Sequence, residues 1–222
     1  MKKPASSTRY SERTSARGKK AAAAFDRARR VVAQEAARII VEQGIQDYRV
    51  AKNKAADRLG MTERGALPGN SEIEQAVGEH LELFGRESHL DLLRGLRRAA
   101  LSAMELLAAF GPRLVGPVLN GTAASNSAIN LHVFSDNFEQ VAMALEERQV
   151  PFRLYERRLK SRRDRAETFT GLRFMHQESA VEATVFPVNG VRQAPISPID
   201  GKPMRRADAR AVRDLLDDTG TG

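Results

Sequence analysis

The stretch Leu114–Phe134, LVGPVLNGTAASNSAINLHVF, decides how the rest of the chain is interpreted. It holds two glycines, Gly116 and Gly121, and ends in a run of apolar and polar residues. Glycine adopts backbone conformations that other residues avoid, so the pair indicates a tight turn ahead of a strand. The short apolar runs predict one strand over 113–119 and a second strand over 129–134.

This stretch resembles the active-site motif of the DNA polymerase beta-like nucleotidyltransferase superfamily, particularly its minimal bacterial branch. That motif runs apolar-Gly-Ser, has a second glycine four residues later, and continues as Ser-Asp-x-Asp-apolar in a strand. Gly116 and Gly121 match the two glycines, and Ser127 matches the serine before the first aspartate. Pro117 replaces the first serine. The resemblance implies a nucleotide-binding role for Gly116, Gly121, Thr122 and Ser127.

The acidic residues of the motif are missing, because Ala128 and Asn130 stand at the two aspartate positions. In the family these aspartates share one face of a strand and, with a third carboxylate, hold divalent metals. Glu182, in AVEATVF, is the candidate third carboxylate. One carboxylate is a poor magnesium site. We therefore expect no metal and no cofactor. Mg²⁺ would be needed only if the protein is an active nucleotidyltransferase.

Two further groups of residues are candidates for binding. Asn130, His132 and Glu182 would share a strand face, either as a hydrogen-bonded polar patch or as a weak site for one metal ion. The run YERRLKSRRDR, 155–165, is expected on a hairpin between the third and fourth strands. It is either a solvated loop or a phosphate-binding basic surface. The residues of that surface are Arg157, Arg158, Lys160, Arg162 and Arg163.

The N-terminal half predicts helices from apolar spacing of threes and fours. They cover 20–44, 47–59, a segment beginning near Ser71 with Glu74 at the capping-box position, and 87–110. After residue 110 the pattern changes to strands, at 113–119, 129–134, 152–159, 172–176 and 180–187. One helix capped by Ser135 or Asp136 lies between them, and another covers 207–217.

These elements predict an α+β (α/β) fold, a small mixed sheet with flanking helices preceded by a helical N-terminal module. The expected domains are a disordered basic tail over 1–19, the helical module over 20–110, and a nucleotidyltransferase-like domain over 111–218. The long stretch 186–206, rich in Pro and Gly, is expected to be an ordered strap over the open face where a substrate would otherwise lie.

The amino-acid composition excludes several classes of protein. The 222 residues include no cysteine, which excludes disulfides and cysteine nucleophiles. The net charge of +8 is concentrated in residues 1–20, which hold seven Lys or Arg and one Glu, so the remaining body is nearly balanced. No apolar run is long enough to span a membrane. We expect a cytoplasmic protein that does not bind membranes.

Three functions follow as hypotheses. The leading one is a catalytically degenerate nucleotidyltransferase-like protein that binds a nucleotide, a nucleic acid or a protein partner. The first alternative is an active nucleotidyltransferase with rearranged metal ligands, using Glu182 and Asp136 beside the position of Asn130. The second alternative is a structural or regulatory interaction protein with an empty pocket. The sequence leaves the ligand, the partner and the oligomeric state open.

Overall fold

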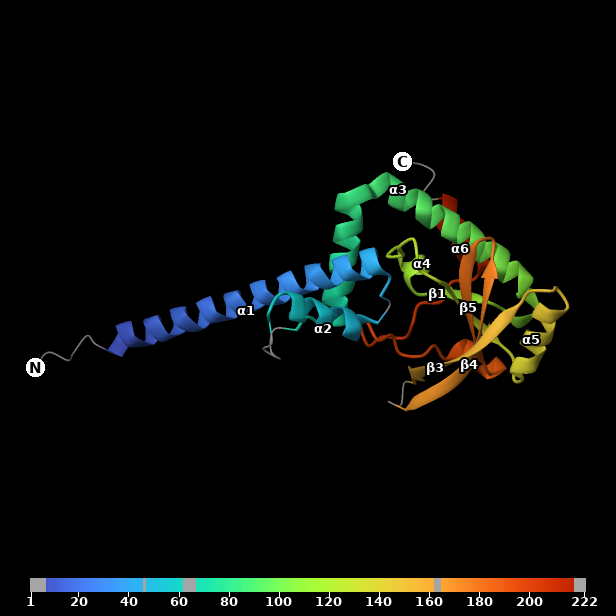
Figure 1. Cartoon of the computed structure of the whole chain (residues 1–222). Helices are drawn as coiled ribbons and strands as arrows, with labels where there is room; N and C mark the ends of the chain where they lie inside the picture. The colour runs from blue at the N-terminus through green and yellow to red at the C-terminus, as the bar shows by residue number, and fades with distance from the viewer. Residues whose placement is uncertain (1–6, 46, 62–66, 162–164, 218–222) are drawn as a thin grey trace, which may run out of the picture. The chain divides into compact units, whose positions relative to one another are not determined.

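The computed structural model describes residues 7–45, 47–61, 67–161 and 165–217. The chain divides into two compact units, Met1–Val77 and Gly78–Gly222. Helices together with a five-stranded mixed sheet give the α+β class that the sequence predicted (Figure 1). The division lies inside a helix and not at the expected 110/111 boundary.

The first unit begins with α1 (Ser7–Gln43) and α2 (Tyr48–Arg58). Helix α1 stops at Gly44 as predicted, because this glycine adopts a left-handed φ of 66°. Its start is a correction, since the helix begins at Ser7 and includes most of the stretch expected to be a disordered tail. No proline lies between residues 7 and 43 to end the helix.

Small side chains let α1 and α2 pack closely, with Ala36, Ala51 and Ala55 fully buried. Asp47 caps α2 by accepting hydrogen bonds from the first-turn amides. Ion pairs and one phenol hydrogen bond then tie the helices of this unit together. They are Arg29 with Glu72 at 2.6 Å, Arg58 with Glu35 at 3.0 Å, and the Tyr48 hydroxyl donating to Glu74.

The two helices expected around 71–84 and 87–110 are one helix, α3 (Asn70–Leu106), followed by the short η2 (Ala108–Phe110). Gly85 stands between the two predicted segments, and a helical glycine costs only about 1 kcal/mol, so it does not end the helix. The start is also corrected, because the Gly69 N–H donates to Glu72 at 2.7 Å. Glu72, and not Glu74, therefore takes the capping-box role, because it accepts the hydrogen bond from the amide just before the helix.

The second unit is built on a sheet with strand order β1-β2-β5-β4-β3. Only β2 and β5 are parallel, and the other neighbours are antiparallel. All five predicted strands are confirmed, as β1 (Arg113–Val115), β2 (Ile129–Phe134), β3 (Phe152–Lys160), β4 (Ala166–His176) and β5 (Ser179–Phe186). The first is shorter than expected, because Pro117 begins the short helix α4 (Pro117–Asn120).

One face of this sheet is the hydrophobic core. Alternate residues of the strands, such as Leu131, Leu172 and Ala183, are fully buried on it. The C-terminal part of α3 packs there, together with α5 (Phe138–Glu146) and α6 (Ala209–Asp217), which explains why the unit boundary precedes residue 110 (Figure 1). The cap of α5 is Asn137, not Ser135 or Asp136.

The other face of the sheet, the open face, is crossed by residues 187–208, the strap. The strap begins with η3 (Val188–Arg192) and pairs Ile196 with Lys160 of β3 and Ala207 with Leu114 of β1. Since β1 and β3 are the two edge strands, the strap reaches both edges. The expected ordered strap is confirmed.

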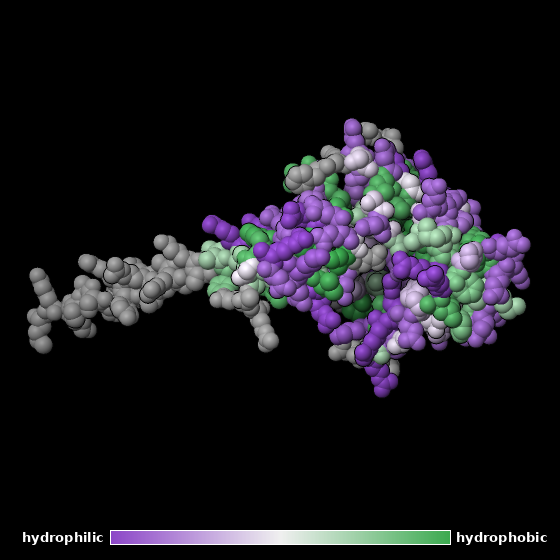
Figure 2. Space-filling view, in the orientation of Figure 1, coloured by the Kyte–Doolittle hydropathy of each residue, from purple (hydrophilic) through white to green (hydrophobic). Residues whose placement is uncertain are grey.

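The visible surface mixes hydrophilic side chains with small apolar areas (Figure 2). None of the helices in the described part of the chain is long and apolar enough to cross a membrane.

Candidate functional site

The parallel pair β2 and β5 brings Asn130 and Glu182 side by side. The two residues are register partners, and both side chains lie on the open face, almost fully buried. Asn130 donates a hydrogen bond to the Ala128 carbonyl at 3.3 Å. The structure thus places the two candidate residues together, as their positions in the motif implied.

Arg157 of β3 binds both of these side chains. One guanidinium nitrogen donates to the Glu182 carboxylate at 2.6 Å and the other donates to the Asn130 amide oxygen at 3.2 Å. Arg173 of β4 lies 3.6 Å from the second carboxylate oxygen of Glu182. The planar fork of arginine suits this two-point contact. The carboxylate is therefore held between two guanidinium groups.

The glycine turn lies directly beside this cluster. Gly116 has a φ of 73°, and a Cβ atom there would lie 3.2 Å from the Asn130 amide nitrogen. Gly121 has a φ of 86°, and its carbonyl lies 2.9 Å from a ring nitrogen of His89. The two glycines therefore allow a left-handed backbone on both sides of α4 and a close approach to Asn130.

The amides of the turn are used within the turn. The N–H groups of Asn120, Gly121 and Thr122 donate to the carbonyls of Gly116 and Pro117, and Pro117 itself has no N–H. The Ser127 hydroxyl accepts a hydrogen bond from the Ala124 N–H at 2.9 Å. The predicted phosphate cradle at Gly116, Gly121, Thr122 and Ser127 consequently offers few free donors.

Asp136 is not part of the cluster, which corrects the expectation that it joins Glu182. It lies beyond the end of β2, is exposed, and accepts a hydrogen bond from the Val188 N–H at 3.0 Å. Ser135 already pairs with Phe186, four residues along β5 from Glu182, which corresponds to about 13 Å of strand. Among the described residues, no group of three His, Cys, Asp or Glu side chains is arranged to hold a metal.

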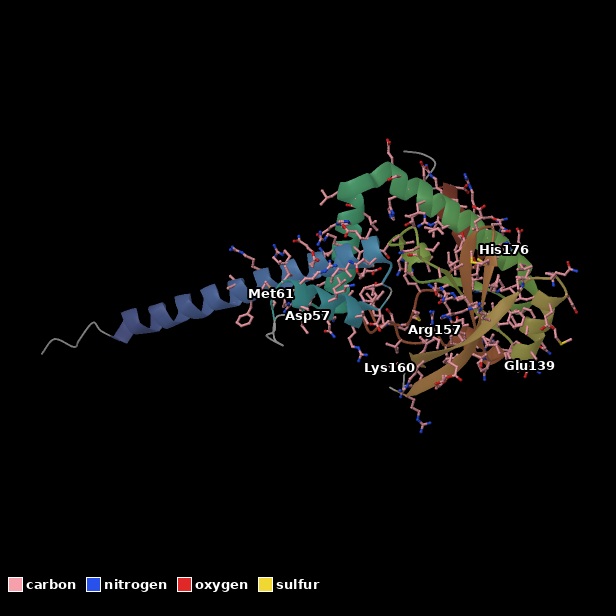
Figure 3. The ribbon with its side chains drawn as sticks, viewed as in Figure 1. Asp57, Met61, Glu139, Arg157, Lys160 and His176 are labelled. Atoms are coloured by element: carbon pink, nitrogen blue, oxygen red, sulfur yellow. The ribbon has the colours of Figure 1, made fainter. Side chains whose placement is uncertain are left out.

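The predicted basic surface is divided between the two faces of the sheet. Successive side chains of a strand point to opposite faces, so Arg157 lies on the open face while Arg158 and Lys160 lie on the other. Figure 3 labels Arg157 and Lys160 on β3. Arg162 and Arg163 lie outside the described residues. Arg157, Arg158 and Lys160 therefore do not belong to a single basic surface.

A second interaction on the open face links the strap to the sheet. Arg206 Nε donates to His132 Nδ1 at 3.0 Å, and the same guanidinium donates to the Gly190 carbonyl at 2.8 Å. Its charge also lies over the rings of Phe134 and Phe186. Burial, followed by the charges of Arg206 and Arg157, holds the pKa of the His132 ring well below 6.5. His132 is therefore a neutral acceptor and not a free metal ligand.

The sequence missed Arg173 as a member of the open face. Alternation along β4 would have found Arg173, because it shares the parity of Gly171 and Phe169. No comparable signal exists for Arg206, which follows an irregular segment. Burial, followed by the charge of Arg113, lowers the pKa of Arg206 to about 10, so it remains charged at neutral pH.

No protein-family model, curated protein or solved structure matches this chain. The chemistry of the site must then be inferred from its geometry. A carboxylate already neutralised by one guanidinium, with a second guanidinium beside it, leaves an excess of positive charge on the open face. Such an arrangement suits the binding of an anion.

Proposed function

We propose that the second unit is a nucleotidyltransferase-like module that binds a phosphate-bearing ligand, a nucleotide or a nucleic acid, without transferring its phosphoryl groups. The observation that carries this proposal is the position of Arg157. It bridges Asn130 and Glu182, two of the three positions at which the resemblance would place metal-binding carboxylates. A fixed guanidinium charge thus stands in place of a metal.

The charge balance of the open face supports this ligand class. Arg153 has the same parity on β3 as Arg157, and Arg173 lies opposite it on β4, so both point to the open face. The Arg157 side chain is 29% exposed and that of Arg173 is 58% exposed. Because Glu182 cannot use all the N–H groups of two guanidiniums, donors remain for phosphate oxygens.

Phosphoryl transfer has less support. Metal-assisted transfer needs carboxylates that bridge ions to the phosphates. Asp136, the proposed substitute ligand, is bound to the backbone of η3, and Glu182 is bound to Arg157. Binding a metal at Glu182 would first require breaking a 2.6 Å ion pair.

The test is binding with and without a divalent metal. Thermal unfolding is followed with nucleoside triphosphates, tripolyphosphate and a short single-stranded RNA, each with Mg²⁺ or with EDTA. We expect stabilisation that persists in EDTA and weakens as salt increases. A requirement for metal would support the active enzyme, and no stabilisation by any of these ligands would favour the interaction protein.

The informative variant is Arg173→Gln, because Arg173 is exposed and Arg157 still neutralises Glu182 without it. We expect a loss of affinity of about threefold to tenfold, the usual effect of losing one charged contact. Arg158→Gln is the matched control, because Arg158 lies on the neighbouring strand but points to the opposite face. Equal losses in both variants would contradict binding at the open face.

A further inference from the structure

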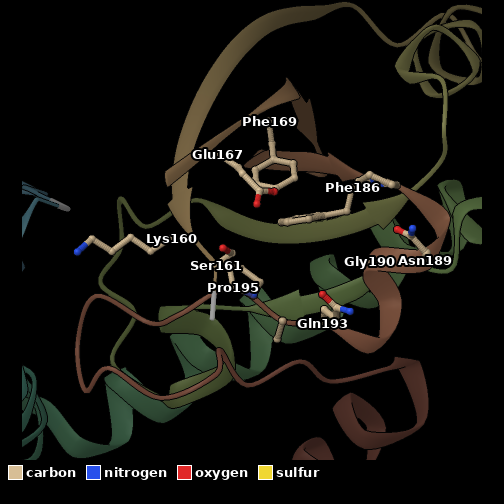
Figure 4. A pocket seen from close by; sticks show the side chains of 11 residues that line it. Lys160, Ser161, Glu167, Phe169, Phe186, Asn189, Gly190, Gln193 and Pro195 are labelled. Atoms are coloured by element: carbon tan, nitrogen blue, oxygen red, sulfur yellow. The ribbon is translucent and has the colours of Figure 1, made fainter. Parts of the chain in front are cut away.

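A pocket lies on the open face next to Arg157 and Arg173, the arginine cluster. It opens between the ends of β3, β4 and β5 and the first part of the strap (Figure 4). The sheet contributes Glu167, Phe169 and Phe186, and the strap contributes Asn189, Gln193 and Pro195. The Lys160 side chain points away from the pocket, while its backbone carbonyl binds the Ile196 N–H of the strap.

One wall of the pocket is aromatic and fixed. The ring centroids of Phe169 and Phe186 are 4.4 Å apart, and Phe186 also lies 4.4 Å from the His132 ring. Phe186 is only 3% exposed, so its ring has little freedom to move. Across the pocket, the buried Pro195 adds a second apolar contact. A flat ring inserted here would gain stacking and apolar contact with little rearrangement.

The remainder of the lining is polar and available. Glu167, Asn189 and Gln193 are exposed at the pocket, and within the described part of the chain none of these side chains is engaged in a hydrogen bond or ion pair. Figure 4 shows the Glu167 carboxylate directed into the pocket beside Phe169. A carboxylate only accepts hydrogen bonds, whereas a side-chain amide both donates and accepts. This set fits the edge of a ring that carries N–H donors and a carbonyl oxygen.

The strap wall of the pocket is held by Arg206. Arg206 donates to the Gly190 carbonyl and, at 3.3 Å, to the Val191 carbonyl, and both residues belong to η3. Gly190 also lines the pocket. The bond from Arg206 to His132 therefore positions one side of the pocket against the sheet.

The pocket and the arginine cluster are neighbours on the sheet. Phe169 of β4 is the register partner of Arg157 on β3. Directly opposed residues of antiparallel strands have Cβ atoms only about 5 Å apart. The Arg157 side chain begins beside the pocket and ends at Glu182, whose register partner Arg173 lies four residues, or about 13 Å of strand, from Phe169. A ring in the pocket and an anion on the Arg157 side chain are therefore within the span of one extended nucleotide, and Arg173 lies at the far end of that span.

We infer that this pocket binds a single unpaired purine, with guanine the best match, whose phosphate lies at the Arg157 and Arg173 side chains. Guanine presents two adjacent N–H donors, which suit the two oxygens of Glu167, and a carbonyl oxygen, which suits Asn189 or Gln193. The base would stack on Phe169. This inference rests on the proposed function for the phosphate and on the pocket for the base.

Calorimetric titration separates the base from the phosphate. The ligands are guanosine 5′-monophosphate, inosine 5′-monophosphate, uridine 5′-monophosphate, guanosine and tripolyphosphate. Inosine lacks the exocyclic amine, so we expect it to bind about fivefold more weakly than guanosine monophosphate. Uridine monophosphate should bind more weakly still. Equal affinities for the three monophosphates would overturn the inference while leaving the proposed phosphate binding intact.

Variants at exposed positions keep the test independent of folding. Glu167→Gln should remove most of the preference for guanine over inosine, and Gln193→Ala should weaken all purine ligands by about threefold. Glu156→Gln is the control, because Glu156 is an exposed carboxylate on the opposite face of β3. Unchanged selectivity in Glu167→Gln would also overturn the inference.

Two further ligands distinguish a free nucleotide from an unpaired nucleotide in RNA. They are a single-stranded RNA of uridines with one guanosine, and the same strand without guanosine. Tighter binding of the guanosine strand than of the monophosphate assigns the pocket to nucleic acid, and the reverse assigns it to free nucleotide.

Guanosine that binds when tripolyphosphate does not would retain the base pocket and reject the phosphate site. No binding of any ligand would reject both.

Discussion

Arg206 donates a hydrogen bond from Nε to Nδ1 of His132 at 3.0 Å, and this bond joins the strap to the second strand of the sheet. The acceptor nitrogen must carry no proton, so the bond exists only while the imidazole is neutral at that position. Burial lowers the pKa of His132, and the nearby charges of Arg206 and Arg157 lower it further. The contact is therefore coupled to pH.

This coupling predicts a fall in stability on acidification. Below pH 6.5 the unfolded chain takes up a proton on His132 that the folded chain does not, so the free energy of unfolding rises with pH in that range. The contribution is complete above pH 6.5 and decreases below it. Each pH unit in that window corresponds to at most about 1.4 kcal/mol. We expect the melting temperature to fall by roughly 2 to 4 °C for each 1 kcal/mol lost.

His132→Gln provides the comparison, because glutamine offers Arg206 an uncharged acceptor. Its melting temperature should change less than that of the original protein between pH 7 and pH 5.5. All other pH-dependent changes are shared by the two proteins, so the difference between the two curves isolates His132. Parallel curves would show that the ring does not resist protonation.

Gly171 has the most crowded position among the described glycines. A Cβ atom there would overlap the ring of Tyr155, whose hydroxyl lies 2.8 Å from the Thr184 hydroxyl oxygen. Gly171→Ala must displace the phenol ring and break this bond. We expect a loss of about 2 to 4 kcal/mol in the free energy of unfolding, measured by urea denaturation.

The matched experiment is Tyr155→Phe, which keeps the ring over Gly171 and removes only the hydroxyl. It should cost about 1 kcal/mol. If Gly171→Ala lowers the free energy of unfolding no more than Tyr155→Phe does, the close approach of the Tyr155 ring does not explain why glycine occupies position 171.

The elements that were predicted well share one property, a pattern that local physics determines. Strand β2 was predicted with both boundaries correct because its apolar residues alternate with Asn130 and His132 between two polar segments. Helix α2 was predicted over 47–59 with its glycine stop, and the structure shows Asp47 as its cap. Helix α3 was divided wrongly, since a single glycine near its middle cannot outweigh packing along the helix.

The candidate site was only partly accessible from the sequence. The pairing of Asn130 with Glu182 followed from the motif, because residues at corresponding places on neighbouring strands are forced together. Arg157 was grouped with Arg158 on one basic hairpin, whereas strand alternation turns Arg157 to the open face and leaves Arg158 on the other face. Arg206 could not be placed, because the path of an irregular strap depends on tertiary contacts.

Gly116, which precedes α4, and Gly95, which lies inside α3, should respond oppositely to alanine. Gly116→Ala requires a left-handed φ and moves the new Cβ to within 3.2 Å of Asn130, so we expect a loss of about 1 to 3 kcal/mol. Gly95→Ala meets nothing within 4 Å and lies in an exposed helical position, so we expect a gain of about 0.5 to 1 kcal/mol. Thermal unfolding measures both, and a stabilised Gly116→Ala variant would contradict the turn geometry.

The last prediction concerns the metal site that the motif lacks. Asn130→Asp alone places a second carboxylate beside Glu182, but Arg157 then bridges two negative groups, so we expect a stronger ion pair and no metal binding.

Asn130→Asp combined with Arg157→Gln leaves the two carboxylates adjacent without their counter-ion. Mutual repulsion then favours a divalent cation, for which two carboxylates and water are adequate ligands. A metal at 100 times its dissociation constant would stabilise this double variant by about 2.7 kcal/mol. Thermal unfolding with and without Mn²⁺ measures the effect, with Arg157→Gln alone as the control. Manganese binding by Asn130→Asp alone would mean that Arg157 does not occupy the metal position.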